Sequence, residues 1–166
     1  MMDQEVAKTG ELNKEIRLFL NDIDLSQQLN IQGQSITFSD FLSNKLLLVL
    51  AIREGIPYSI FSLIQNNTPF TINDWADYLN LSNKSLQRYR QQNKKFKPIY
   101  SEKILELAEV TNLGLEIFGD LDKFKLWLET PNYAFGNLKP YELLKDSYGK
   151  EMIINELTRI DHGIFV

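Results

Sequence analysis

Apolar residues recur every three or four positions along most of this chain, which is the spacing of helices that bury one face. Residues 1–10 are largely polar and predict a loose arm. From Glu11 onward the spacing predicts an amphipathic helix, which ends before a Gln- and Asn-rich loop. A second helix is expected to start at a cap formed by Ser39 or Asp40 and to end near Gly55.

Prolines and short polar residues mark the starts of further helices, because proline fits the first helical turn and short polar side chains cap exposed amides. The expected start positions are Pro57, Thr71, Ser82, Ser101, Asp120 and Pro140. A last helix is expected over residues 147–160. We identify no convincing strand and no internal repeat, and therefore predict an all-α fold with only small local pairings.

The stretch "TINDWADYLNLSNKSLQRYRQQ" has the spacing of a helix-turn-helix. Small Ala76 would let two helices touch, and Asn80 occupies the sharp turn, where a positive φ favours Gly or Asn. Ser82 would cap the second helix, which would bury Leu86 and Tyr89. An ordinary pair of antiparallel helices can show the same spacing, so both interpretations remain open on these residues alone.

Composition limits the classes of protein that remain possible. The chain has 166 residues, of which 43% are hydrophobic, enough to fill the core of one domain or two small ones. Its richest apolar run, "KLLLVLAI", is too short to span a membrane, and no secretory leader is visible. Cysteine is absent, which excludes disulfides and thiolate chemistry and suits a cytoplasmic protein.

The net charge of −4 hides a basic island. Residues 84–103 hold seven Lys and Arg residues against Glu102 alone, whereas the segments before and after them are acidic. A basic island in an acidic chain indicates either a polyanionic partner or a solvated helix end.

The outer face of the second helix of the motif favours DNA. Its polar stripe contains Gln, which pairs with adenine, and Lys and Arg, which pair with guanine, and lysines follow in a short loop suited to phosphates. The candidate DNA-binding residues are Ser82, Asn83, Lys84, Gln87, Arg88, Gln91, Lys94, Lys95 and Lys97. The competing interpretation is a solvated helix face, which has a similar composition.

The same composition argues against catalysis. His162 is the sole histidine, and one histidine without cysteine cannot assemble a usual nucleophile–base pair or a histidine-rich metal site. No glycine-rich phosphate loop is present, although accidental carboxylate pairs remain possible among 22 acidic residues. We therefore expect no enzymatic activity, and no metal, cofactor or small-molecule substrate.

The chain closes on "LTRIDHGIFV", in which a helix-like run precedes Gly163 and three apolar residues, Ile164, Phe165 and Val166. Terminal residues are usually polar and frayed unless something holds them in place. The apolar end therefore packs either on this protein's own last helices or on another protein, and the residues alone leave both interpretations open.

Residues 127–166 carry a series of family motifs. These are Trp127-Leu128, Thr130-Pro131-Asn132, Ala134 with Gly136, Pro140-Tyr141-Glu142-Leu143-Leu144, Gly149, and Arg159-Ile160-Asp161-His162-Gly163-Ile164-Phe165. The segment resembles the C-terminal domain of Xre/MbcA/ParS-family antitoxins. "IREGIP" at residues 52–57 and the helix-turn-helix fit the family's upstream part. Phe135 and Tyr148 depart from the pattern, because Phe135 is bulkier than usual and Tyr148 stands where a smaller or charged residue is common.

The resemblance implies an antitoxin of a type II toxin–antitoxin pair. It implies an Xre-like helix-turn-helix and dimerisation domain (41–118) and a small helical toxin-binding domain (119–166). Residues 1–40 do not match the family, and we expect them to form an N-terminal extension with one amphipathic helix. The expected partners are operator DNA, a second copy in a homodimer, and a cognate RES-domain toxin, which consumes NAD. A stand-alone transcriptional regulator or DNA-segregation adaptor and a purely structural helical module are the competing interpretations.

On this resemblance, we hypothesise that the last residues enter the toxin's active site and exclude its dinucleotide. Ile164 and Phe165 would fill apolar walls of that site. Asp161 and the carboxylate of Val166 would meet the cations that hold a pyrophosphate.

Three residues that precede Ile164 would have separate roles at the end of the last helix. Gly163 would let the chain leave by a left-handed step, and His162 would add a hydrogen-bonding group. Arg159 would either anchor on the toxin or bond the last helix carbonyls. The candidate toxin-binding residues are therefore Arg159, Asp161, His162, Gly163, Ile164, Phe165 and Val166.

Overall fold

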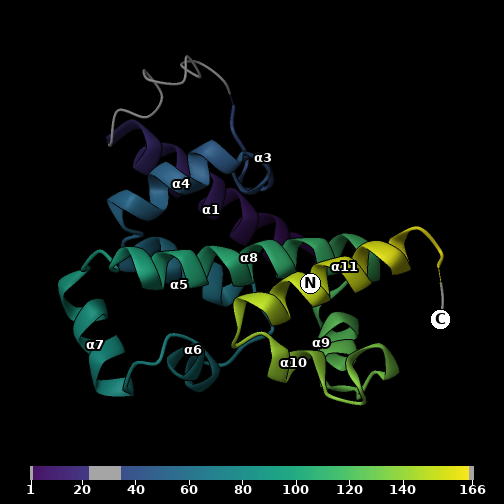
Figure 1. Ribbon diagram of the computed structural model, residues 1–166. Coiled ribbons are helices and arrows are strands. Elements are labelled where there is room, and N and C mark those ends of the chain that lie inside the picture. Colours follow the sequence, from purple (N-terminus) through teal and green to yellow (C-terminus); the bar gives the residue numbers. More distant parts are fainter. Residues whose placement is uncertain (1, 23–34, 165–166) are drawn as a thin grey trace. The chain divides into compact units, whose positions relative to one another are not determined.

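A computed structural model describes residues 2–22 and 35–164 of the chain (Figure 1). The helices of these residues are α1 (Met2–Asp22), α3 (Phe38–Ser43), α4 (Lys45–Glu54), α5 (Tyr58–Asn66), α6 (Ile72–Tyr78), α7 (Asn83–Gln92), α8 (Pro98–Phe118), α9 (Leu121–Glu129), the short 3-10 helix η1 (Tyr133–Phe135), α10 (Pro140–Leu143) and α11 (Ser147–Asp161). The described residues contain no strand, only two isolated bridges, Pro57 with Lys95 and Asn132 with Leu138. The predicted all-α fold is confirmed.

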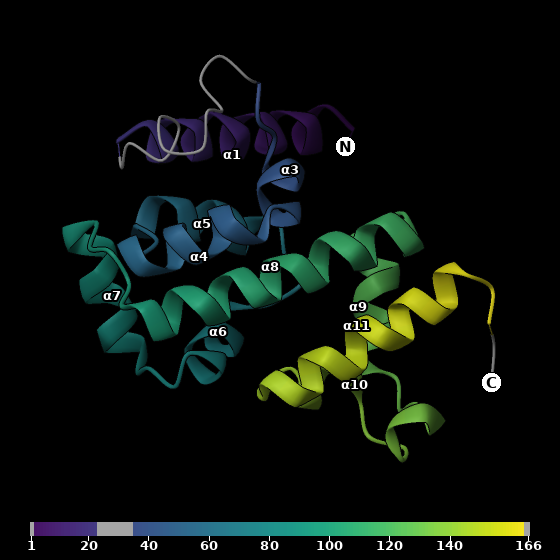
Figure 2. The same cartoon turned by 45° about the horizontal axis from the view of Figure 1, so that its top comes forward.

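The chain forms two compact units (Figure 2). The N-terminal unit comprises Met1–Asn67 and Thr71–Leu105, and the C-terminal unit comprises Thr68–Phe70 and Glu106–Val166. Helix α8 contributes its first turns to one unit and its remainder to the other. Among the described residues, no helix combines the length and apolar character needed to cross a membrane.

The core of the N-terminal unit begins with α1, which packs on α5 and α3. Leu12, Ile16 and Leu20 are buried at the spacing of one helical face, as the sequence predicts. The expected loose arm is wrong, because α1 begins at Met2. Residues 2–10 contain no proline and are rich in helix-forming residues, so the helix extends beyond its apolar stripe. The expected loop after Asp22 lies mainly outside the described residues.

The second predicted helix is divided in two. Thr37, not Ser39 or Asp40, is the cap of α3, and Asp40 closes a capping box by accepting a hydrogen bond from the Thr37 amide. That hydrogen bond lowers the pKa of Asp40 below its usual value. Asn44 then ends α3 and caps α4 through its side chain, because an extended residue there interrupts the helix. Helix α4 ends at Gly55, as predicted.

Ser101 has a different role from the predicted cap. Helix α8 begins at Pro98, and Ser101 lies fully buried inside it. Its hydroxyl accepts a hydrogen bond from the Ile56 amide at 2.9 Å and donates one to the Phe96 carbonyl at 3.2 Å. The side chain thus joins α8 to the segments that precede α5 and follow α7, a long-range contact that local capping rules do not reveal.

The C-terminal unit is built around an aromatic cluster. The Phe124 ring lies 6.0 Å from that of Phe118 and 6.2 Å from that of Trp127, and Trp127 meets Phe135 at 6.3 Å. Phe124 and Phe135 are buried, whereas Trp127 is half-buried. A Cβ at Gly114 would overlap the Phe124 ring, so this glycine lets α9 approach α8 closely.

Helix α11 is fixed to the rest of the C-terminal unit by charge as well as apolar contacts. Ile153 and Leu157 are fully buried, and α11 packs on α10. The Lys150 ammonium donates a hydrogen bond to the Glu109 carboxylate at 2.9 Å, and both side chains are largely shielded from solvent. One face of α11 is therefore committed to the core of this unit.

Candidate nucleic-acid interface and carboxy-terminal site

Helices α6 and α7 form the predicted helix-turn-helix. Thr71 and Asp74 form a capping box at the start of α6. The Thr71 amide donates a hydrogen bond to the Asp74 carboxylate at 2.7 Å, and the Asp74 amide donates one to the Thr71 hydroxyl at 3.2 Å. Ser82 caps α7 by accepting a hydrogen bond from the Ser85 amide at 3.1 Å. Both predicted caps are confirmed, and together they fix where each helix of the motif begins.

The turn between these helices has the predicted conformation. Asn80 has a φ of 52°, the left-handed region that Asn tolerates better than most residues. Its amide donates to the Asp77 carbonyl at 3.1 Å, and the Leu81 amide donates to the Ala76 carbonyl at 2.9 Å. Ala76 is buried, as expected for a small residue in this motif.

The inner face of α7 is held by aromatic stacking. Tyr89 lies parallel to Phe96, with ring centroids 4.2 Å apart and planes 8° from parallel. Phe61 meets Phe96 at 5.1 Å and Trp75 at 5.2 Å, both edge to face. Burial raises the pKa of the Tyr89 hydroxyl. This packing fixes the rotation of α7 about its axis, and therefore which residues it presents outward.

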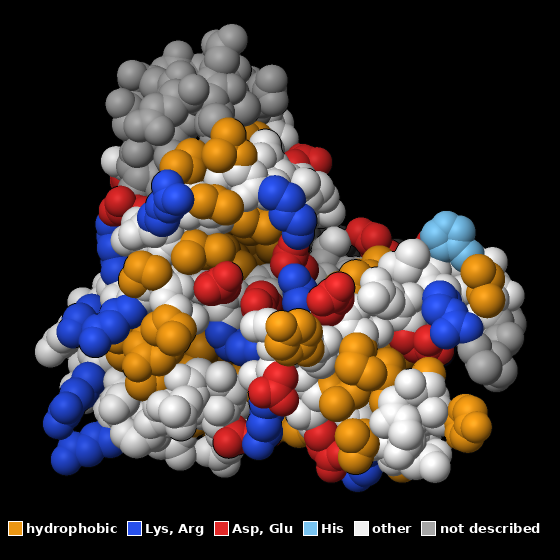
Figure 3. Space-filling model, viewed as in Figure 1, with side chains coloured by type: hydrophobic (Ala, Val, Ile, Leu, Met, Phe, Trp, Pro, Cys, Tyr) orange, Lys and Arg blue, Asp and Glu red, His pale blue; other side chains and the backbone are white. Residues whose placement is uncertain are grey.

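The outward face of α7 carries the predicted polar stripe. Lys84, Gln87, Arg88 and Gln91 are all exposed, as are the capping residue Ser82 and its neighbour Asn83. Figure 3 shows Lys and Arg side chains gathered over the end of the N-terminal unit that carries α7. Asn83 donates a hydrogen bond to the Asn73 side chain at 3.0 Å, so it links the two helices of the motif.

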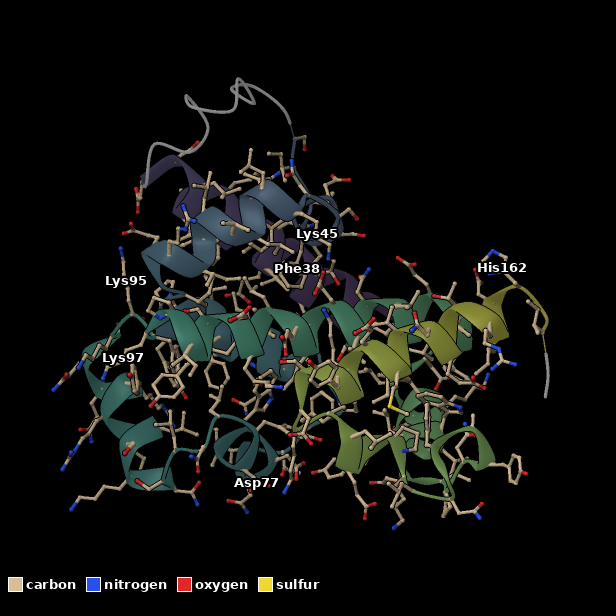
Figure 4. The ribbon with its side chains drawn as sticks, viewed as in Figure 1. Phe38, Lys45, Asp77, Lys95, Lys97 and His162 are labelled. Carbon is tan, nitrogen blue, oxygen red and sulfur yellow. The ribbon has the colours of Figure 1, made fainter. Side chains whose placement is uncertain are left out.

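The three loop lysines differ in their surroundings. Lys95 forms an ion pair with Glu54, and the Lys94 ammonium lies 5.6 Å from the Tyr89 ring centroid. Lys97 is exposed at the start of α8, and Figure 4 shows it and Lys95 near the end of α7. The pairing with Glu54 could not be read from local sequence, because the partner lies 41 residues away.

Backbone contacts hold this loop in place. The Phe96 amide donates to the Ile56 carbonyl at 2.8 Å, and the Tyr58 amide donates to the Lys94 carbonyl at 3.2 Å. A Cβ at Gly55 would stand 2.5 Å from the Phe96 carbonyl oxygen, so only glycine allows this approach. The loop that carries the lysines is thus anchored to the start of α5.

The second candidate site is the end of α11. Gly163 has a φ of 69°; its amide donates to the Ile160 carbonyl, and the Ile164 amide donates to the Arg159 carbonyl, both at 2.9 Å. This pair of bonds is a Schellman ending, which confirms the predicted left-handed step. Ile164 is 54% exposed, and Phe165 and Val166 lie outside the described residues.

The polar residues before Gly163 also have defined positions. His162 and Asp161 are exposed, and the His162 Nδ1 atom lies 2.7 Å from the Thr158 carbonyl oxygen (Figure 4). Arg159 forms an ion pair with Glu156 at 3.3 Å, a contact that the sequence did not predict. The Nε2 atom of His162 is the ring nitrogen that remains for another contact.

The motifs of the C-terminal unit have structural explanations. Asn132 caps η1 by accepting a hydrogen bond from the Ala134 amide at 2.9 Å, and the Thr130 hydroxyl donates to the Leu126 carbonyl at 2.6 Å. Phe135, bulkier than the family pattern, is accommodated against Trp127. Gly149 is buried against the Leu143 backbone, where a side chain would clash. In the part of the chain that the structure describes, no three His, Asp or Glu residues are grouped to hold a metal ion.

Comparisons with known proteins match the two parts of the chain that carry these residues. A family model described as an antitoxin Xre-like helix-turn-helix domain matches residues 47–109, and one described as the antitoxin Xre/MbcA/ParS C-terminal toxin-binding domain matches residues 113–163. The antitoxin Xre of Photorhabdus laumondii subsp. laumondii is 29% identical over 114 residues, which span 68% of this chain and 77% of that relative.

A second relative extends the comparison. The antitoxin Xre of Yersinia enterocolitica serotype O:8 is 30% identical over 86 residues, which span 51% of this chain and 58% of that relative. The helix-turn-helix that carries the polar stripe and the unit that carries the Gly163 turn therefore coincide with the two matched domains. The chain belongs to the Xre/MbcA/ParS family of antitoxins.

Proposed function

We propose that this antitoxin neutralises a RES-type, NAD-consuming toxin by inserting its carboxy-terminal residues into the toxin's active site. The observation that carries the proposal is the exposed turn at the end of α11. Gly163 directs the chain out of the helix, and Ile164 is left exposed beyond it. Ile164 begins the apolar sequence Ile164-Phe165-Val166, which would suit a partner's apolar pocket.

The chemistry of this end suits a site that binds a dinucleotide. Such a site offers apolar walls to the rings and cations to the pyrophosphate. Ile164 and Phe165 supply apolar groups, and exposed Asp161 supplies a negative charge for those cations. His162 and Arg159 lie on the last turns of α11 and would contact the rim of the toxin's site.

The N-terminal unit is proposed to bind the operator of its own gene. Helix α7 would enter the major groove, with Lys84, Gln87, Arg88 and Gln91 toward base edges. Exposed Lys97 and the neighbouring Lys94 would meet phosphates. Lys95 would have to exchange its Glu54 partner for a phosphate, so its contribution should be smaller.

We further propose that the operator-bound form is a homodimer, because two-fold proteins match palindromic operators. The capping residue Ser82 and the first helical residue Asn83 would then place the start of α7 against the backbone of each half-site. Sedimentation of the protein with and without its promoter DNA measures this directly, and a single copy per operator would contradict it.

Co-expression with the candidate toxin tests the function as a whole. The proposed function predicts that the toxin co-purifies with the antitoxin, and that cellular NAD is maintained only when both are made. If the protein binds its promoter but neither captures the toxin nor preserves NAD, a stand-alone helix-turn-helix regulator replaces the proposal.

A further inference from the structure

Helix α11 and its C-cap His162 carry a stripe of side chains, exposed except for half-buried Arg159, that leads to the Gly163 turn. Its members recur every three or four residues and fall within about 80° of the helix circumference, at ~100° per residue. They are Tyr148, Met152, Asn155, Arg159 and His162. The buried residues Gly149, Ile153 and Leu157 occupy the opposite side. The stripe thus lies on the side of α11 that faces away from the core of the C-terminal unit, beside exposed Glu151 and Thr158.

The beginning of this stripe is apolar. Tyr148 is 84% exposed and Met152 is 44% exposed. Because they are four residues apart on a helix, their side chains are neighbours, with Cβ atoms roughly 5–6 Å apart. A large aromatic ring beside a flexible thioether is a common composition for the energetically dominant part of a protein interface.

We propose that Tyr148 and Met152 form a second anchor for the toxin, separate from the carboxy-terminal residues. This inference rests on the proposed toxin-binding function and adds a surface to it. The occupant is assigned to the toxin because the stripe lies within the matched toxin-binding domain and runs along the same helix to the Gly163 turn. The two ends of the stripe are ~21 Å apart, a span that a single partner of ordinary size covers.

With two anchors, one surface would determine the affinity for the toxin and the other would inhibit it. The Tyr148–Met152 end would supply binding energy, because both side chains are exposed. The end beyond Gly163 would block the active site. The firm attachment of α11 through Lys150 and Glu109 would keep the two anchors at a fixed separation, which limits the entropy lost on binding.

The test measures the affinity of the full-length antitoxin for purified cognate RES-domain toxin. The Tyr148→Ala/Met152→Ala variant should raise the dissociation constant at least tenfold, because both side chains are exposed anchors. Tyr148→Phe should bind nearly as well as the wild type, since the ring is kept. The matched control is Ile99→Ala, which removes a 71% exposed apolar side chain from the N-terminal unit and should leave affinity unchanged.

The outcomes separate this inference from the function on which it rests. Wild-type affinity in the double variant, with an unchanged melting temperature, would overturn the second anchor. A double variant that changes only self-association would also overturn it, by assigning the stripe to a second copy of the chain. Failure of the wild-type protein to bind the toxin would instead overturn the proposed function.

Discussion

Gly149 lies against the backbone of Leu143, so closely that a Cβ there would stand 3.0 Å from the Leu143 Cα and nearer still to its carbonyl oxygen. The contact joins the first turn of α11 to the end of α10. The glycine of this motif is therefore explained by packing within the C-terminal unit and needs no contact with a ligand.

Gly149→Ala should destabilise the C-terminal unit by at least ~2 kcal/mol, because backbone cannot yield as a flexible side chain does. Gly10→Ala in α1 is the matched control; no atom lies within 4 Å of its added Cβ, so it should stabilise by about 0.5–1 kcal/mol. Urea unfolding, followed by the far-ultraviolet circular dichroism of the helices, reports both units and therefore both substitutions. Equal effects of the two substitutions would refute this explanation of Gly149.

Ser101→Ala should lower the free energy of unfolding of the N-terminal unit by about 1–3 kcal/mol, because it leaves the buried Ile56 amide without its acceptor. Ser43→Ala removes an exposed hydroxyl that bonds only within its own short helix, to Ser39, and should cost much less. Denaturant unfolding of both variants measures the difference. If Ser101→Ala is as stable as the wild type, the hydroxyl does not join these segments.

The two kinds of DNA contact should be separable by salt. Arg88→Ala should cost about 1–3 kcal/mol and relax the preference for the natural promoter, as expected of a base contact. Lys97→Ala should weaken binding to all sequences alike and reduce the slope of log K against log salt by about 1. Titrations of promoter and scrambled DNA at several salt concentrations distinguish them. Lys125→Ala, on α9 of the C-terminal unit, is the control and should change neither quantity.

Acid should weaken the start of α9 through Asp120. The hydrogen bond from the Lys123 amide lowers the pKa of Asp120 in the folded protein, so its charge stabilises the fold above the unfolded pKa. That stabilisation is lost as pH falls through the lowered value. Asp120→Asn keeps an acceptor without a titrating charge, so its melting temperature should fall less between neutral and acidic pH. Parallel pH profiles for the two proteins would contradict this role.

Local signals were sufficient to predict much of the fold. Thr71, Asn80 and Ser82 act within a few residues of themselves, so their capping and turn roles follow from residue type and position. The left-handed step at Gly163 was predicted for the same reason.

Contacts between residues far apart in the sequence could not be predicted, because local residue patterns do not show which segments meet. Ser101 has the residue type of a cap, but its partners at Ile56 and Phe96 place it inside the core. The sequence predicts Lys95 as a phosphate-binding residue, but it does not show that the Glu54 carboxylate already pairs with the Lys95 ammonium. The DNA and toxin contacts and the domain limits at residues 40 and 118 stay predictions.

Neutralisation as proposed requires the carboxy-terminal residues to block the toxin's active site. The direct measurement is the rate of NAD consumption by purified RES-domain toxin mixed with the full-length antitoxin or with a variant lacking residues 163–166. We predict that the full-length protein suppresses NAD consumption, whereas the shortened protein still captures the toxin but lets NAD consumption resume. Equal suppression by both proteins would contradict the account.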